Sequence, residues 1–264
     1  MTVALIDADI IVYESAFRCQ DAIEWEPGEW THAASMPDAQ ADFRATIEFI
    51  LRKTGCDKAV LALTDSDRDA NFRRKVWPKY KDHREGPGDG RPLLYRALRE
   101  WIRTEFTVRE KHGIEGDDTL GIMATLPGDH EPCVICSVDK DLDTIPGRHF
   151  NWRKEELGVY EVDECWADYN FMFQTLTGDS TDGYPGLPGC GPVRAERILA
   201  GLETDGLETM WINVVAAYEK KGLTEGDALI QARCARILQA CDWDFDACEP
   251  ILWEPPTEER TNES

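Results

Sequence analysis

The sequence has no long apolar run, and it contains fewer basic residues (29) than acidic residues (51). Nowhere do eighteen apolar residues follow one another, and no basic cluster precedes the first apolar segment. These two absences argue against a membrane-spanning helix and a secretory signal, and they predict a cytoplasmic protein. The formal net charge of −22, taken as an average over the chain, argues against an anionic partner such as a nucleic acid.

Disulfide-forming cysteines are also not expected. The nine cysteines are an odd number without a secretory signal, which predicts reduced thiols. Cys133 and Cys136 form one CxxC pair inside an apolar run, where a strand points them to opposite faces, so core packing is favoured over zinc. Cys234, Cys241 and Cys248 recur every seven residues, which predicts a C-terminal helix with these cysteines on a buried side.

One segment reverses the overall charge. Residues 68–103 contain eleven lysines and arginines and five acidic residues, a net charge of +6 within an acidic chain. A solvated helix face explains many charge runs of this kind. A surface that contacts a polyanion is the alternative.

The apolar pattern predicts an α/β fold. Three β-branched runs each end in an aspartate: residues 3–6 before Asp7, 59–64 before Asp65, and 133–138 before Asp139. Continuous apolar runs of this length suit strands buried on both faces, and residues 41–53 and 92–106 show helical periodicity. We therefore expect a largely parallel central sheet flanked by helices.

The second half of the chain has a different pattern. From about residue 163 helical periodicity dominates, which predicts an α/β core over residues 1–162 and a helical subdomain over 163–264. Residues 20–40 lack a clear period and predict a long acidic loop.

Nine acidic residues are candidates for one site: Asp7, Asp65, Glu115, Asp117, Asp118, Asp139, Asp141, Asp179 and Asp182. The carboxyl ends of parallel strands meet at one edge of a sheet, which would gather the aspartates that follow the strands. Asp139 and Asp141 are two residues apart, and Asp179 and Asp182 are three apart, so each pair can aim at one point. The acids at 115–118 open a helical stretch, and capping alone explains one or two of them.

Such a cluster requires cations. Nearby carboxylates repel one another and take up protons unless cations neutralise them, and ligands that are all oxygen suit Mg²⁺ or Mn²⁺. Because one divalent ion cannot use so many carboxylates, two ions about 3.5–4 Å apart are expected.

A turn rich in glycine and proline follows the last acidic pair. It contains Gly186, Gly189 and Gly191 and leads into helical periodicity from residue 193. Glycines allow a backbone to approach a phosphate closely, and a helix N-terminus supplies N–H groups and the positive end of a dipole. The segment therefore predicts a grip on a nucleic acid backbone that reads no bases.

Taken together, the motifs resemble the 5′-to-3′ exonuclease and flap endonuclease family, particularly its bacteriophage members. In chain order they are LIDAD, FRRKVWPKYKDHR, EGDD, SVDKD and LTGDSTDGYPGLPGCGP, and they extend from about residue 3 to 199. The resemblance implies a PIN-like nuclease core, a helical arch near residues 78–103, and a helix-three-turn-helix near 171–199 that grips duplex DNA.

The resemblance also implies roles for individual residues. A first metal ion would be held by Asp7, Asp65, Glu115, Asp117 and Asp118, and a second by Asp139, Asp141, Asp179 and Asp182. Asp7, Asp139, Lys81 and Arg84 would be catalytic, the last two through the scissile phosphate. DNA contacts would come from Arg73, Tyr80, Lys81, Arg84, Gly186, Gly189, Gly191 and Arg194.

Some assignments stay open. The loop from Asp65 to Arg73 is one residue longer than is usual in the family, which leaves Asp67 as an alternative ligand. Tyr80 either stacks on a base or packs inside the protein. Asp182-Gly183 stands where Asp-Asn is common, and Val193-Arg194 replaces a lysine after the turn, which alters the duplex grip. A potassium ion binds at this turn in relatives and is a further option here.

The implied function is that of a metal-dependent 5′ nuclease. It would act as a 5′-to-3′ exonuclease, a flap endonuclease or both, on DNA with a duplex 5′ end, a flap or a single-strand junction, and release 5′-phosphate products. A DNA-binding accessory protein that does not cleave is one alternative, but it leaves Asp7, Asp139 and Asp141 unexplained. A PIN-type ribonuclease is another, against which the segment 178–199 argues.

Overall fold

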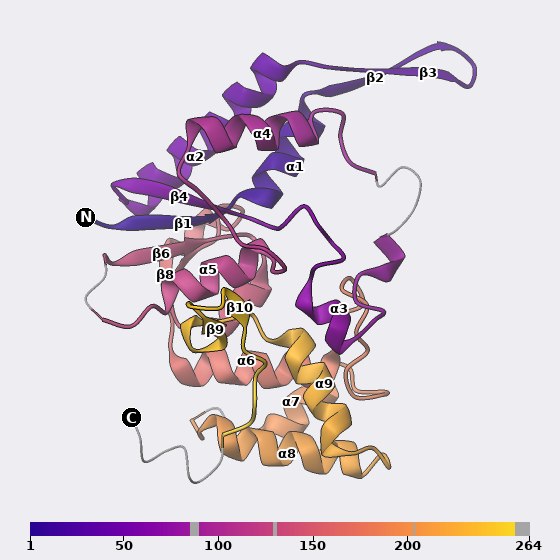
Figure 1. Ribbon diagram of the computed structural model, residues 1–264, viewed down its shortest axis with the longest axis vertical. Coiled ribbons are helices and arrows are strands. Elements are labelled where there is room, and N and C mark those ends of the chain that lie inside the picture. The colour runs from indigo at the N-terminus through magenta and orange to yellow at the C-terminus, as the bar shows by residue number, and fades with distance from the viewer. Residues whose placement is uncertain (85–89, 129–130, 203, 257–264) are drawn as a thin grey trace.

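A mostly parallel sheet forms the centre of the protein (Figure 1). The computed structural model describes residues 1–84, 90–128, 131–202 and 204–256, without the side chain of Arg84. The strands of this sheet are β1 (Val3–Asp7), β4 (Lys58–Leu63), β5 (Val108–Glu110), β6 (Cys133–Cys136), β7 (Gly147–Phe150) and β8 (Val159–Val162). Their order is β5-β4-β1-β6-β7-β8, and every neighbouring pair is parallel except β7 and β8.

Helices cover both faces of this sheet. One face packs against α1 (Ala8–Arg18), α2 (Met36–Thr54) and α4 (Tyr95–Glu105), and the other against α5 (Gly116–Ala124). The central strand β1 shows why its sequence is continuously apolar. Ala4 and Ile6 point into the first cluster, whereas Val3 and Leu5 point into the second. Asp7 ends this strand at the carboxyl edge of the sheet.

Residues 20–40 do not form the predicted loop. They form a hairpin of β2 (Gln20–Glu26) and β3 (Glu29–Ala34) that projects from the body of the molecule, followed by the start of α2 (Figure 1). Ser35 caps this helix by accepting a hydrogen bond from the Asp38 N–H at 3.4 Å. The prediction was wrong because the hairpin is exposed on both faces, so no apolar alternation marks its strands.

Four helices form the lower part of the molecule in Figure 1. They are α6 (Glu164–Thr177), α7 (Pro192–Leu199), α8 (Leu207–Glu219) and α9 (Glu225–Ala235). They share one apolar cluster, which also takes in Tyr80, shortly after α3 (Phe72–Val76). The segment from Val76 to Tyr80 therefore packs against the helical part of the chain.

The predicted C-terminal cysteine stripe is wrong. Cys234 is buried in α9, but this helix ends at Ala235, and Cys241 and Cys248 are exposed beyond it. The CxxC prediction is confirmed, since Cys136 packs in the cluster under α1 and Cys133 packs in the opposite cluster. The remaining short elements are η1 (Asp82–Arg84), η2 (Lys140–Thr144), η3 (Glu155–Leu157), η4 (Ala240–Asp242), β9 (Trp243–Asp244) and β10 (Glu249–Pro250).

The length and apolar character of the helices were compared with what a membrane-spanning helix needs. Within the described ranges, none combines the length and the apolar character that crossing a membrane requires.

Candidate metal and nucleic acid site

Eight carboxylates from four parts of the chain line one cavity of about 350 Å³. They are Asp7, Asp9, Glu115, Asp117, Asp139, Asp141, Asp179 and Asp182. The carboxyl ends of β1 and β6, the first turn of α5 and the turn after α6 bring these side chains together. Seven of the nine acids predicted from the sequence therefore surround one space.

Hydrogen bonds join the acids that follow β1 and β6. The Ser137 hydroxyl donates to Asp7 Oδ2 at 3.0 Å and accepts from the Asp139 N–H at 3.0 Å. Asp139 in turn accepts from the Asp141 N–H at 2.9 Å. The ends of two neighbouring strands are thus tied together through one serine, which sets the positions of these carboxylates.

Burial and mutual repulsion raise the pKa of several acids in the cavity. Burial, followed by the charges of Asp9 and Asp139, raises the pKa of Asp7 to about 7. Burial and the charge of Asp139 raise the pKa of Asp141 to about 7. Burial and the charges of Asp7 and Asp139 raise the pKa of Asp117 well above its ordinary value. A bound cation would favour the ionised form of all three.

Lys81 provides positive charge inside the cavity. Its Nζ lies 2.6 Å from Glu115 Oε1 and 3.3 Å from Asp182 Oδ2. Its backbone has a φ of 53°, which is uncommon for a residue other than glycine, and its N–H donates to the Asp182 carbonyl at 2.7 Å. Burial alone would raise the pKa of Glu115, but the charges of Lys81 and then Arg73 outweigh it and lower this pKa to about 2.

The donors in this cavity fit a hard divalent cation. The acidic groups offer carboxylate oxygens, the ligand type that Mg²⁺ and Mn²⁺ prefer. Burial and then mutual repulsion raise the pKa values of Asp7 and Asp141, and a bound cation would offset both effects. In the part of the chain that the structure describes, no three His, Cys, Asp or Glu side chains stand close enough to hold one ion as placed. The fit therefore rests on donor type and charge.

Residues 2–170 match the family model of the 5′-3′ exonuclease N-terminal resolvase-like domain. The chain belongs to the 5′-3′ exonuclease family. Its relatives include an exodeoxyribonuclease of Enterobacteria phage T3 and an exonuclease of Escherichia phage T7. Each is 29% identical to this chain, and each match covers 96% of this chain and 93% of the relative. The family predicted from the motifs is thus confirmed.

Solved structures of phage T5 proteins share the fold. The T5 5′-exonuclease with bound zinc has a TM-score of 0.56 at 17% identity, over 89% of this chain and 93% of that chain. The T5 D15 flap endonuclease in a pseudo-enzyme-product complex with DNA and metal ions has a TM-score of 0.54 at 17% identity, over 89% of this chain and 91% of that chain. The predicted α/β class with a largely parallel sheet is confirmed.

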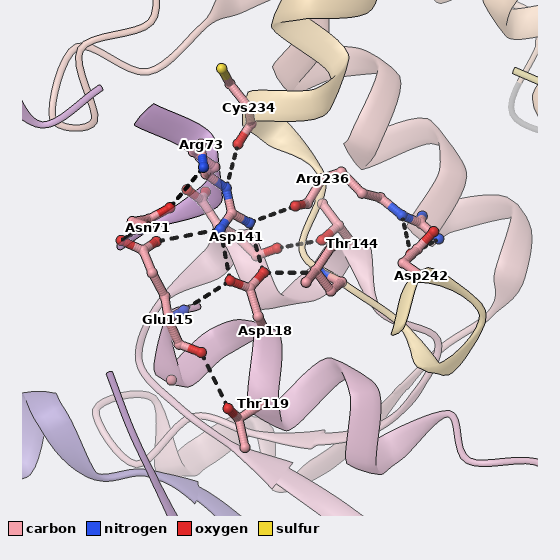
Figure 2. Close-up of polar contacts among 12 residues, drawn as sticks. Asn71, Arg73, Glu115, Asp118, Thr119, Asp141, Thr144, Cys234, Arg236 and Asp242 are labelled. Carbon is pink, nitrogen blue, oxygen red and sulfur yellow. Dashed lines mark hydrogen bonds and ion pairs between the residues drawn. The ribbon is translucent and has the colours of Figure 1, made fainter. Parts of the chain in front are cut away.

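In this member of the 5′-3′ exonuclease family, Asp118 and Arg73 pair with each other (Figure 2). Two guanidinium nitrogens of Arg73 each lie 2.7 Å from an Asp118 oxygen, and the two residues are 2% and 0% exposed. Asp118 was predicted to hold a metal ion and Arg73 to contact DNA. Both predictions are wrong, because the two side chains are buried against each other.

Asp65 lies outside the carboxylate cavity. It accepts hydrogen bonds from the N–H groups of Gly113 at 2.9 Å and Asp67 at 3.0 Å, and its Oδ2 lies 2.8 Å from His112 Nδ1. Asp65 and Asp67 line a neighbouring cavity of about 440 Å³ instead. The structure therefore brings neither the predicted ligand Asp65 nor its alternative Asp67 to the other acids, because local turns use the Asp65 carboxylate.

Tyr80 packs inside the protein. It is 2% exposed, its ring lies beside Tyr184, and its hydroxyl is 3.0 Å from Glu115 Oε2 and 2.7 Å from Asp182 Oδ2. The predicted DNA contact at Tyr80 is wrong, and the packing alternative holds. The hydroxyl has one hydrogen, so it donates to one of the two carboxylates at a time.

The Gly-Pro turn uses its glycines in two ways. Gly186 is buried with a φ of 62°, and a Cβ there would lie 2.3 Å from the Gly178 nitrogen. Since its N–H donates to Gln231 Oε1 at 2.9 Å, the predicted DNA contact at Gly186 is wrong. Gly189 and Gly191 are exposed, and Arg194 is half-buried in the first turn of α7. DNA contact by these three stays a prediction.

The arch prediction falls partly outside the described residues. The structure does not describe residues 85–89 or the side chain of Arg84, so the role of Arg84 stays a prediction. The end of the predicted range is not an arch, because Leu98 and Ile102 of α4 are buried in the cluster on the sheet.

Sequence reasoning missed Asp9 and Arg99. Asp9 lies in the first turn of α1, accepts from the Thr64 N–H at 2.7 Å, and pairs with Arg99 Nη1 at 2.6 Å. Burial outweighs the charge of Arg99 and raises the pKa of Asp9. The second aspartate of LIDAD was a usable signal, because a residue in a first helical turn can face the same sheet edge as the strand end before it.

Proposed function

We propose that this protein is a metal-dependent 5′ nuclease that hydrolyses phosphodiester bonds in DNA, as a 5′-to-3′ exonuclease, a flap endonuclease or both. The observation that carries the proposal is the ring of eight carboxylates around one cavity, with Lys81 among them. Membership of the 5′-3′ exonuclease family supports it, as do the phage T3 and T7 exonucleases that match nearly the whole chain.

The cavity would hold two divalent ions, Mg²⁺ or Mn²⁺, between two sets of carboxylates. One set comprises Asp7, Glu115 and Asp117, and the other comprises Asp139, Asp141, Asp179 and Asp182. Such ions supply an activated water and neutralise the charge that develops on the phosphate and the leaving 3′ oxygen. The metal ions bound in the T5 exonuclease and flap endonuclease structures support this assignment.

The chain's own residues would orient the substrate. The Lys81 ammonium, held by Glu115, would stabilise a phosphate oxygen in the cavity, and Arg84 would add a second cationic contact. The exposed Gly189 and Gly191 before α7, together with the half-buried Arg194 in its first turn, would bind the backbone of duplex DNA. We assign this grip to a helical subdomain of residues 163–264 that contains a helix-three-turn-helix near 171–199. A potassium ion at this turn stays an option.

A cleavage assay separates this proposal from a DNA-binding protein that does not cleave. Duplex DNA labelled at its 5′ end is incubated with the protein in Mg²⁺, and then in EDTA. We expect short labelled products in Mg²⁺ and none in EDTA. Binding without any metal-dependent product would reject the nuclease assignment, and cleavage confined to a matched RNA strand would favour the ribonuclease alternative.

Asp139→Asn tests the cavity directly. The substitution keeps the shape of the side chain and removes its charge, so we expect the cleavage rate to fall by about 10³-fold. DNA binding in EDTA should stay within about twofold of the original protein, because Asp139 faces the ions and not the duplex grip. Asp67→Asn, outside the cavity, is the matched control and should cleave normally. Retained turnover in Asp139→Asn would remove this residue from the site.

The choice between exonuclease and flap endonuclease needs substrates that differ only at the 5′ end. Duplexes with a free end, a blocked end, a gap and a single-stranded flap are compared under the same conditions. Cleavage that a blocked end abolishes identifies an exonuclease, whereas cleavage at the base of a blocked flap identifies an endonuclease.

A further inference from the structure

The proposed function gives the chain beyond residue 200 no role at the metal ions, yet this part reaches the carboxylate cavity. Cys234, Ala235 and Ile237 line its wall. Cys234 and Ala235 end α9, and Ile237 lies two residues beyond it. The C-terminal part of the chain is therefore a neighbour of the site.

One link runs from the end of α9 to α5. Arg73 donates to the carbonyls of Cys234 at 3.0 Å and Arg236 at 2.6 Å, at the end of α9 where carbonyls lack partners within the helix. The same guanidinium holds Asp118 with both oxygens, and Asp118 accepts from the Glu115 N–H at 3.0 Å (Figure 2). Through Arg73, α9 is joined to the first turn of α5, which carries Glu115 and Asp117 into the cavity.

A second link runs from α9 to the turn after α6. Gln231 is 5% exposed, and its Oε1 accepts from the Gly186 N–H at 2.9 Å. Gly186 packs tightly against Gly178, directly before Asp179. Through Gln231, α9 is therefore joined to the turn that carries Asp179 and Asp182 into the cavity.

We propose that Arg73 and Gln231 are positioning residues through which α9 holds Glu115 and Asp117 at a fixed separation from Asp179 and Asp182. The inference rests on the proposed nuclease function. Glu115 and Asp117 come from the α/β part of the chain, and Asp179 and Asp182 come from the helical part, so no strand or helix of their own fixes the distance between them. Lys81 and Tyr80 contact Glu115 and Asp182 inside the cavity. Because α9 is linked to the segments that carry both pairs of acids, it contributes to the distance between the pairs and thereby to the spacing of the ions.

Two substitutions remove one link each. Arg73→Lys keeps the charge but loses the planar fork that reaches Asp118 and two carbonyls together. Gln231→Met keeps the length of the side chain and loses the acceptor for Gly186. Each substitution should weaken the affinity for Mn²⁺ or lower kcat in Mg²⁺ by about 10- to 100-fold. Electron paramagnetic resonance without DNA measures the Mn²⁺ affinity. DNA affinity in EDTA should stay within about twofold, since neither residue is exposed.

Tyr218→Phe is the matched control for a general loss of stability. It deletes a buried hydrogen bond of the same helical part, from the Tyr218 hydroxyl to the Thr175 carbonyl at 2.8 Å, and Tyr218 does not line the cavity. We expect it to lower the melting temperature while leaving Mn²⁺ binding and kcat unchanged.

The outcomes are distinct. Folded Arg73→Lys and Gln231→Met proteins with unchanged Mn²⁺ binding and kcat would overturn the inference, as would an equal loss in Tyr218→Phe. If Arg73→Lys does not fold, Gln231→Met decides. If the original protein binds Mn²⁺ but cleaves no DNA, the proposed function fails, and the Mn²⁺ measurement still tests the positioning role.

Discussion

At the scale of single residues, the site places the Lys81 ammonium among eight carboxylates, and Lys140 also lines the cavity. Lys81 lies between Glu115, in the first set of acids, and Asp182, in the second. It is about a quarter exposed, so a phosphate can reach its Nζ. Arg73, the other cation near Glu115, is buried and bonded to Asp118. Lys81 is therefore a partly exposed cation of the cavity that contacts acids of both sets.

Lys81→Met tests this placement. Removing the ammonium takes away a charge at the reacting phosphate, so we expect kcat to fall by about 10²–10³-fold. Single-turnover cleavage at saturating protein measures this step apart from DNA binding. Lys79→Met, two residues away at an exposed position outside the cavity, should keep its kcat. A Lys81→Met rate within about fivefold of the original would contradict the assigned role.

The sequence predicts which way some of the acidic side chains face, but not all of them. The spacing of Asp139 and Asp141, and of Asp179 and Asp182, predicted that each pair would face one point, and all four line the cavity. Asp117 and Asp118 are chemically identical neighbours, but successive residues of a helix point about 100° apart. One therefore faces the cavity and the other faces Arg73. Only tertiary packing distinguishes them, since α3, which packs beside α9, brings Arg73 to Asp118.

At the scale of elements, the β2–β3 hairpin stands apart from the core. Trp25 and Trp30 are 68% and 55% exposed, and most of its other side chains are exposed as well. One hydrogen bond to the body runs from the Leu93 N–H to Gln20 Oε1 at 2.7 Å. Isolated two-stranded hairpins are marginally stable, so this element adds little to the stability of the fold.

Replacing residues 20–34 with a short Gly-Ser loop tests this separation. The ends of the hairpin are paired to each other, Gln20 with Ala34, so a short loop can join α1 to α2. We expect the melting temperature to change by less than about 4 °C. The cleavage rate should stay within about twofold, because no hairpin residue lines the carboxylate cavity. Failure of the shortened protein to fold would show that the hairpin contributes to the core.

The helices and strands that could be predicted are those whose buried faces produce a recognisable pattern of apolar residues in the sequence. β1, β4 and β6 are covered on both faces and are continuously apolar, and α2 and α4 bury one face each. The hairpin buries neither face, so its strands leave no pattern. The end of α9 at Ala235 also lacks a local signal, since no glycine or proline follows it, and the cysteine spacing continues past it.

At the scale of the whole molecule, internal ion pairs use much of the basic segment 68–103. Arg73 pairs with Asp118, Arg99 with Asp9, and Arg103 with Glu110. Its net charge of +6 therefore overstates the positive surface that this segment offers to DNA. Sequence alone cannot show this, because the acidic partners lie outside the segment.

The pKa values of the cavity predict how metal binding depends on pH. Folding raises the pKa of Asp7 and Asp141 to about 7, so their contribution to metal-free stability is lost as the pH rises through about 7. The pKa of Glu115 is lowered to about 2, so this residue adds no pH dependence of stability above the ordinary pKa of a glutamate. Mg²⁺ binds the ionised carboxylates, so it should raise the melting temperature more at about pH 8 than at about pH 6.

Melting curves with and without Mg²⁺ at the two pH values measure this difference. The Asp139→Asn protein is the control and should show a smaller shift at both. A larger Mg²⁺ shift at the lower pH would contradict the assignment of these carboxylates as ligands.

The most direct measurement is an anomalous diffraction experiment on crystals of the protein soaked in Mn²⁺. The account predicts Mn²⁺ peaks inside the cavity, bonded to carboxylates of both sets, from Asp7 and Asp117 on one side to Asp141 and Asp179 on the other. Peaks only outside this cavity, for example at Asp65, or none among these side chains, would contradict it.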